Sequence, residues 1–187
     1  METTALEHIR SGHLLMAVCC FLYLVWWVIF FWPKVSGGSA EGPLHTLGIA
    51  AIIGAVIAAA FGTTRICGGA VSLFRDAMPA TVVTVASAAL LYIVLLVITW
   101  KMFERQPTTE LLLFVAWLAM ELFVAVALSQ AGMPGLPVVI AVGAMAGFIG
   151  SLVCYMLYYQ LKPLPSFIDG CIPLALVGAI SIAAALL

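Results

Sequence analysis

Charged residues are scarce in this chain. Its 187 residues include only seven Lys or Arg and eight Asp or Glu, so 8% are charged, against about 25% in an average soluble domain. No basic run is long enough to follow a nucleic acid backbone or to recognise an anionic lipid surface. Hydrophobic residues make up 65% of the chain, more than a small soluble domain can bury. We therefore expect no nucleic acid partner, and a protein whose solvent is mostly the lipid bilayer.

Patterned metal, nucleotide and disulfide motifs are also missing. The five cysteines form no C-x-x-C pair, the three histidines complete no zinc pattern, and no P-loop is present. His13 and His45 begin successive apolar runs, which lie antiparallel, so the two cannot both ligate one haem. The sequence predicts no cofactor, no metal site and no disulfide framework.

Long apolar runs are what the chain does contain. Six of them reach the roughly 20 residues that a transmembrane helix needs: Leu14–Trp32, Leu44–Thr63, Pro79–Trp100, Leu111–Ala131, Pro137–Leu161 and Cys171–Leu187. Backbone amides find no partners in lipid, so these runs must be helices, and they lack the alternation of a barrel strand. We predict an all-α polytopic membrane protein with six transmembrane helices, forming a single transmembrane domain over residues 1–187.

The connections between the runs are short and rich in Gly and Pro. The segment Thr64–Met78 is the longest of them; we expect a loop there, with a re-entrant segment as an alternative. Charge does not decide the orientation, because three basic residues would lie inside and four outside if both termini are cytoplasmic. We expect a multi-pass protein of the plasma (inner) membrane.

An internal repeat is indicated when the chain is compared with itself at an offset of 93 residues. The matched pairs are Phe21/Phe114, Phe30/Phe123, Gly42/Gly135, Ala51/Ala144, Gly54/Gly147, Phe74/Phe167 and Asp76/Asp169. Chance is the alternative, because apolar sequences match easily. A true repeat would divide the chain into halves 13–100 and 106–187, each with three helices. An odd number of crossings inverts the second half, as in many transporters.

Glu121 is the strongest candidate for a functional residue. It lies near the centre of the fourth run, where an acid costs roughly 2.5–3.5 kcal/mol on insertion scales and usually faces the bundle interior or a water-filled path. Trp117 lies four residues earlier, on the same helix face. We predict that both contribute to a substrate site. The alternative is a protonated structural acid bonded to a neighbouring helix, with Trp117 only packing.

Asp76 and Asp169 are predicted to begin the third and sixth helices, each a few residues before a proline. One interpretation is a helix cap; the other is a symmetric pair of substrate-binding acids at the two mouths of a pathway. Because those helix starts lie at opposite membrane faces, the two cannot form a hydrolytic dyad, and we expect no enzyme.

Small residues are concentrated in the second and fifth runs, including Gly143 and Gly147 in a G-x-x-x-G. We expect these two helices to cross at the centre of the bundle. Taken together, the sequence favours a transporter or channel for a small solute or ion, with Glu121 in its pathway. The alternative is a solute-binding or accessory membrane subunit of a larger complex. A homo-oligomer or partner membrane subunits are compatible with either.

Overall fold

The computed structural model describes residues 2–39, 41–104 and 108–186, and these residues form helices joined by short loops, with no strand. The helices are α1 (Glu2–Ser36), α2 (Pro43–Leu73), α3 (Met78–Phe103), α4 (Thr109–Gln130), α5 (Leu136–Leu157), the short 3₁₀ helix η1 (Tyr158–Gln160) and α6 (Pro163–Leu186). The prediction of an all-helical fold with six long helices is confirmed.

Each of the six α-helices is long and apolar enough to cross a membrane. Many of their large apolar side chains lie on the outside: in α3, the most hydropathic stretch has none of its residues buried. Exposing these apolar side chains to water would be unfavourable, whereas in a bilayer they contact lipid tails that are equally apolar. This suggests a multi-pass integral membrane protein.

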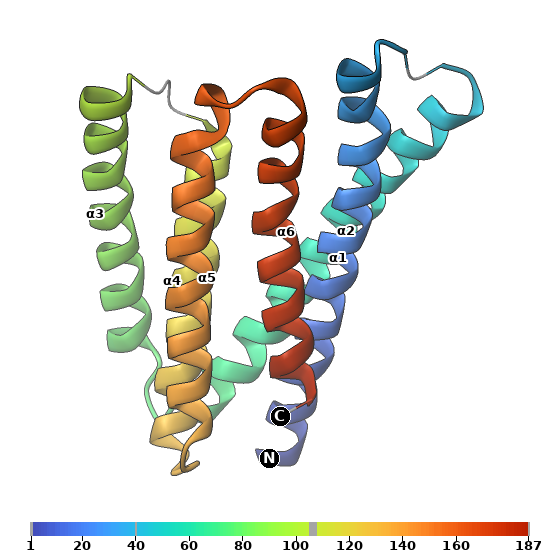
Figure 1. Ribbon diagram of the computed structural model, residues 1–187. Coiled ribbons are helices and arrows are strands. Elements are labelled where there is room, and N and C mark those ends of the chain that lie inside the picture. The colour runs from blue at the N-terminus through green and yellow to red at the C-terminus, as the bar shows by residue number, and fades with distance from the viewer. Residues whose placement is uncertain (1, 40, 105–107, 187) are drawn as a thin grey trace.

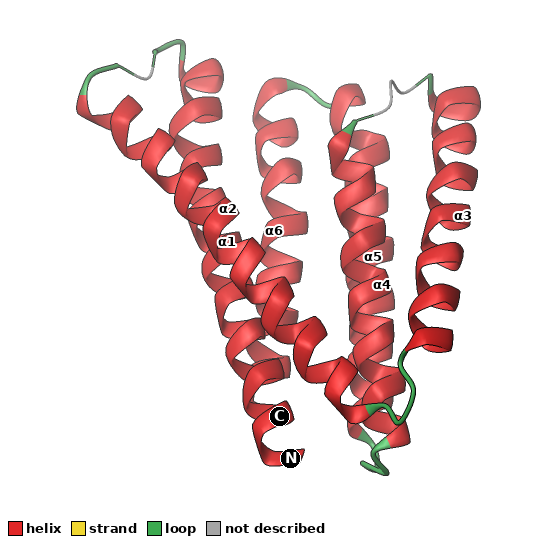
Figure 2. Ribbon diagram, turned by 180° about the vertical axis from the view of Figure 1, so that it is seen from behind, coloured by secondary structure: helices red, strands yellow, loops and turns green. Residues whose placement is uncertain are grey.

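The helices form two groups that meet along α6 (Figures 1 and 2). α1 packs along α2 on one side and α6 on the other, while α5 packs between α4 and α6. α2 is tilted and crosses behind the bundle to reach α4, and α3 lies at the edge against α4. The start of α1 and the end of α6 lie at the same end of the bundle, as an even number of crossings requires.

α1 and α2 approach closely because small residues recur along one face of α2. These buried positions are seven residues apart: Gly48, Ala55, Gly62 and Gly69. A β-carbon on Gly69 would lie 2.7 Å from the carbonyl oxygen of Ala5, and one on Gly62 would lie 3.0 Å from that of Gly12. The backbones of α1 and α2 are therefore in direct contact. The seven-residue spacing of the small residues keeps this contact on one face of α2.

Several predicted boundaries are wrong. α2 continues through Thr64–Leu73, so the expected loop or re-entrant segment there is regular helix. α6 begins at Pro163, eight residues before the predicted start, because prolines are tolerated in a first helical turn. The expected central crossing of α2 with α5 is also not formed by the described residues: α2 packs on α1 and α4, and α5 on α4 and α6.

Candidate functional site

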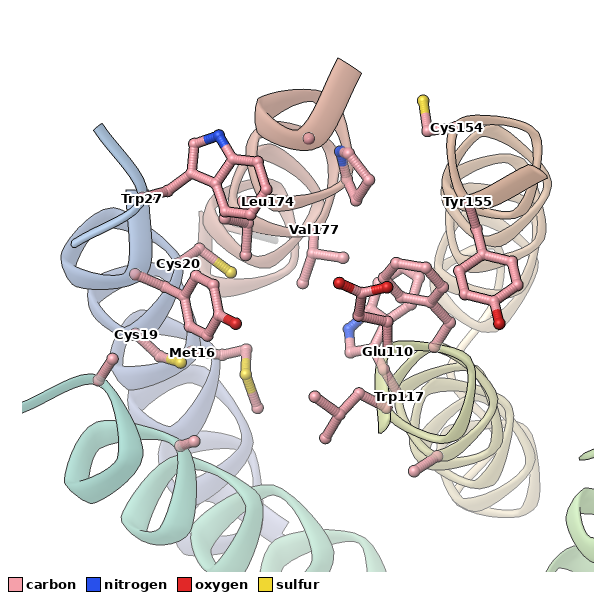
Figure 3. A pocket seen from close by; sticks show the side chains of 18 of the residues that line it. Met16, Cys19, Cys20, Trp27, Glu110, Trp117, Cys154, Tyr155, Leu174 and Val177 are labelled. Atoms are coloured by element: carbon pink, nitrogen blue, oxygen red, sulfur yellow. The ribbon is translucent and has the colours of Figure 1, made fainter. Parts of the chain in front are cut away.

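A cavity of about 470 Å³, here called the chamber, lies among α1, α2, α4, α5, η1 and α6 (Figure 3). Its volume falls within the range of about 300–1,000 Å³ that is usual for small-molecule sites. Aromatic side chains form much of its wall: Tyr23, Trp27, Phe114, Trp117, Tyr155 and Tyr158. Sulfur-containing side chains form another part: Met16, Cys19, Cys20, Met120 and Cys154.

Two carboxylates interrupt this apolar wall. Glu110 comes from the first turn of α4, and its carboxylate points toward the middle of the chamber in Figure 3. It accepts a hydrogen bond from the Thr108 hydroxyl at 3.2 Å. Asp169 comes from α6. Among the described lining residues there is no Lys, Arg or His, so the chamber carries acidic groups without basic ones.

Asp169 reaches the chamber because α6 begins earlier than predicted. With the helix starting at Pro163, Asp169 lies in its second turn, and only 7% of the residue is exposed. Its carboxylate oxygen Oδ2 is buried without a partner among the described residues. An unsatisfied buried acceptor is rare in native structures and calls for a missing donor.

Glu121 is fully buried and contacts His13 of α1. The Glu121 Oε2 to His13 Nε2 distance is 3.1 Å, and His13 Nδ1 lies 2.8 Å from the carbonyl oxygen of Ile9. A carbonyl only accepts, so Nδ1 carries a hydrogen. Nε2 then either accepts from a neutral carboxyl group or donates to a carboxylate. Both forms hold the same proton and are neutral overall, so the pair is a buried proton site.

The His13–Glu121 pair lies just beyond the inner end of the chamber. On α4 the lining residues end at Met120, and on α1 they begin at Met16, one turn from His13. Beyond these positions, Val124, Leu128 and Ile66 are at most 1% exposed. The described part of the chamber therefore runs from one end of the bundle to a packed core, and the buried pair lies at that boundary.

The structure brings together two of the four predicted site residues. Trp117 and Asp169 both line the chamber, whereas Glu121 lies beside its floor and is not a lining residue. Asp76 lies apart: it is exposed, and its Oδ1 accepts a hydrogen bond at 3.1 Å from the Met78 amide at the start of α3. The N-cap residue of α3 is Ala77, which makes no side-chain capping bond, so Asp76 lies one residue before the cap and is not the N-cap that one interpretation expected. Asp169, in contrast, is not at a helix start, so the two aspartates are not equivalent in their surroundings.

Sequence reasoning missed His13 and Glu110. His13 was placed at the edge of the first run, but α1 begins at Glu2 and carries the imidazole into the core. A histidine before a long apolar run was the available signal. Glu110 directly precedes the fourth run, and α4 includes it from the start.

No group of three or more His, Cys, Asp or Glu side chains that could hold a metal ion occurs within residues 2–39, 41–104 and 108–186. Searches of protein-family models, curated proteins and solved structures found no match to this chain.

Proposed function

We propose that the chain is a non-enzymatic transporter for a small solute in the plasma (inner) membrane. The observation that carries the proposal is the chamber, which is large enough for a small molecule and ends at a packed core. An open channel needs a continuous path. In alternating access, the solute site lies near the membrane midplane and is open to only one side of the membrane at a time. A chamber that is closed at one end fits one such state. This favours a transporter over a channel.

The proposal includes the inverted repeat and the predicted halves 13–100 and 106–187. Its support is that α1 packs on α2 and α6, while the matching helix α4 packs on α5 and α3. Within the matched pair of glycines, a β-carbon on Gly54 would lie 3.1 Å from Leu22 of α1, and one on Gly147 would lie 3.1 Å from Trp117 of α4. Each glycine thus contacts the first helix of its own half, although a β-carbon on Gly147 would lie closer still to Ile180 of α6, at 2.5 Å. The α5–α6 contact has no comparable counterpart between the described residues of α2 and α3.

Filling the chamber should abolish transport. Ala59 lines the chamber on α2, so Ala59→Trp places an indole in the solute's space. Purified protein would be reconstituted into liposomes and given a mixture of small metabolites, with uptake read by mass spectrometry. We expect wild-type protein to take up at least one solute, and Ala59→Trp to reduce that uptake at least tenfold.

Ala89→Trp is the matched control, because Ala89 is exposed on α3 and does not line the chamber. It should transport like the wild type. Uptake no greater than that of empty liposomes, or equal uptake by Ala59→Trp, would contradict the proposal. Absence of uptake together with reproducible co-purifying membrane proteins would instead favour the accessory-subunit alternative.

Glu121→Gln tests whether the buried pair takes part in transport. The amide keeps the shape of the side chain, and its N–H can donate a hydrogen bond to His13 Nε2, but it removes the shared proton site. We expect an unchanged folded yield, with uptake reduced about tenfold or a flattened dependence of uptake on pH. Uptake and a pH profile like those of the wild type would remove Glu121 from the mechanism.

A further inference from the structure

The chamber's chemistry points to one class of solute, and this deepens the proposed function, on which it rests. Its polar groups are unevenly matched: two carboxylates, Glu110 and Asp169, face a wall of aromatic rings without a basic side chain among the described lining residues. A carboxylate removed from water is costly unless a positive charge or hydrogen-bond donors compensate it. The Oδ2 atom of Asp169, which is buried without a partner among the described residues, therefore lacks a cationic or donating group that a solute could supply.

Asp169 is the carboxylate for which the described residues leave this gap. The residue is 7% exposed, and its Oδ2 is buried without a partner among the described residues. The backbone adds a second acceptor. Pro173, four residues further along α6, has no N–H to donate to the Asp169 carbonyl oxygen. One turn of α6 thus presents a carboxylate oxygen and a main-chain carbonyl that the helix does not satisfy.

Trp27 is fixed against the same turn of α6. Its Nε1 donates a hydrogen bond to the Phe167 carbonyl oxygen at 3.2 Å, and its ring packs where a β-carbon of Gly170 would otherwise lie. Phe31 stacks on it with ring centroids 3.9 Å apart, and Tyr158 meets it edge-on at 6.0 Å. The indole is therefore held rigidly, within one helical turn of Asp169. A carboxylate beside a fixed aromatic face is the pattern that binds organic ammonium ions.

We propose that the chamber binds a monovalent organic ammonium ion, with its charged group at Asp169 and Trp27. Glu110 adds negative charge from the first turn of α4. The indole N–H of Trp117, buried without a partner among the described residues, would donate to an oxygen on the same solute. A metal ion fits less well, because two carboxylates in an otherwise aromatic and sulfur-lined chamber supply too few oxygen ligands for a hard cation.

The test is binding of choline to detergent-purified full-length protein by isothermal titration calorimetry, beside 3,3-dimethylbutan-1-ol, its neutral isostere. Both carry a hydroxyl and a group of three methyls, and only the charge differs. We expect choline to bind at least tenfold more tightly than the alcohol. Asp169→Asn should weaken choline binding at least tenfold and Glu110→Gln severalfold. Glu41→Gln, which removes an exposed acid outside the chamber, should have no effect.

Tetraethylammonium chloride, sodium chloride and calcium chloride complete the set of probes. Failure of both organic cations to bind more tightly than the neutral alcohol would overturn the inference, even if Asp169→Asn does not fold. So would equal binding of calcium, or choline binding unaffected by Asp169→Asn. Because calorimetry needs no transport, its outcome is separate from the uptake assay: cation binding without uptake contradicts only the proposed function. Uptake of neutral or anionic solutes without cation binding contradicts only the inference.

Discussion

Glu121→Ala is expected to lower the free energy of unfolding by about 3–5 kcal/mol, the usual cost of removing one member of a buried charged or proton-sharing pair. The side chain and that of His13 are both fully buried, and they are each other's partners at 3.1 Å. Truncation leaves the His13 Nε2 in a dry core without hydrogen-bond compensation. The measurement is reversible unfolding in mixed micelles, followed by circular dichroism.

The pair should also show coupling in a double-mutant cycle. Once Glu121 is lost, His13→Ala removes an imidazole that no longer has its partner, so the double variant should be less destabilised than the sum of the two single variants. Glu121→Gln should lose far less than Glu121→Ala, because its amide N–H can donate a hydrogen bond to His13 Nε2. His45→Ala is the control, since His45 is exposed. Additive effects, or equal losses for Glu121→Ala and His45→Ala, would show that the contact does not stabilise the fold.

The number and the type of the helices could be predicted from the sequence because lipid permits so few alternatives. Their ends could not, because hydropathy marks where lipid begins and not where a helix stops. α2 runs ten residues past Thr63 although that stretch contains Arg65 and two glycines. A pattern of small residues would have shown the continuation: Gly69 extends the seven-residue spacing of Gly48, Ala55 and Gly62 beyond the apolar run.

The candidate site was partly predictable for the same reason. An acid in the middle of an apolar run, such as Glu121, can be recognised from the sequence because its insertion into a membrane is unfavourable. Trp117 follows from its helical spacing to Glu121. The partner of Glu121 could not be predicted, because His13 is 108 residues away in the chain and meets it only because α1 and α4 both pack against α2. Asp169 was predicted as a site residue, but its burial was not. The burial depends on α6 starting at Pro163, and the prolines of that segment indicated a loop.

Gly12→Ala is the second substitution with a large expected effect. A β-carbon on Gly12 would lie 2.8 Å from the carbonyl oxygen of Gly62 and 2.9 Å from the amide nitrogen of Ile66. Both atoms are backbone, so no side chain can turn away, and α1 must move from α2. Forcing apart well-packed elements costs about 1–3 kcal/mol and occasionally more. Gly12 precedes His13, so the displacement should also strain the contact with Glu121.

Gly68→Ala provides the matched control for this prediction. Gly68 is also helical, but nothing lies within 4 Å of the position of its β-carbon. The same added methyl there meets open space, and alanine favours a helix over glycine by about 1 kcal/mol. The two substitutions should therefore shift the apparent melting temperature in opposite directions, downward for Gly12→Ala and slightly upward for Gly68→Ala. If Gly12→Ala were as stable as Gly68→Ala, the seam between α1 and α2 would not be close-packed, and the burial of His13 would need another cause.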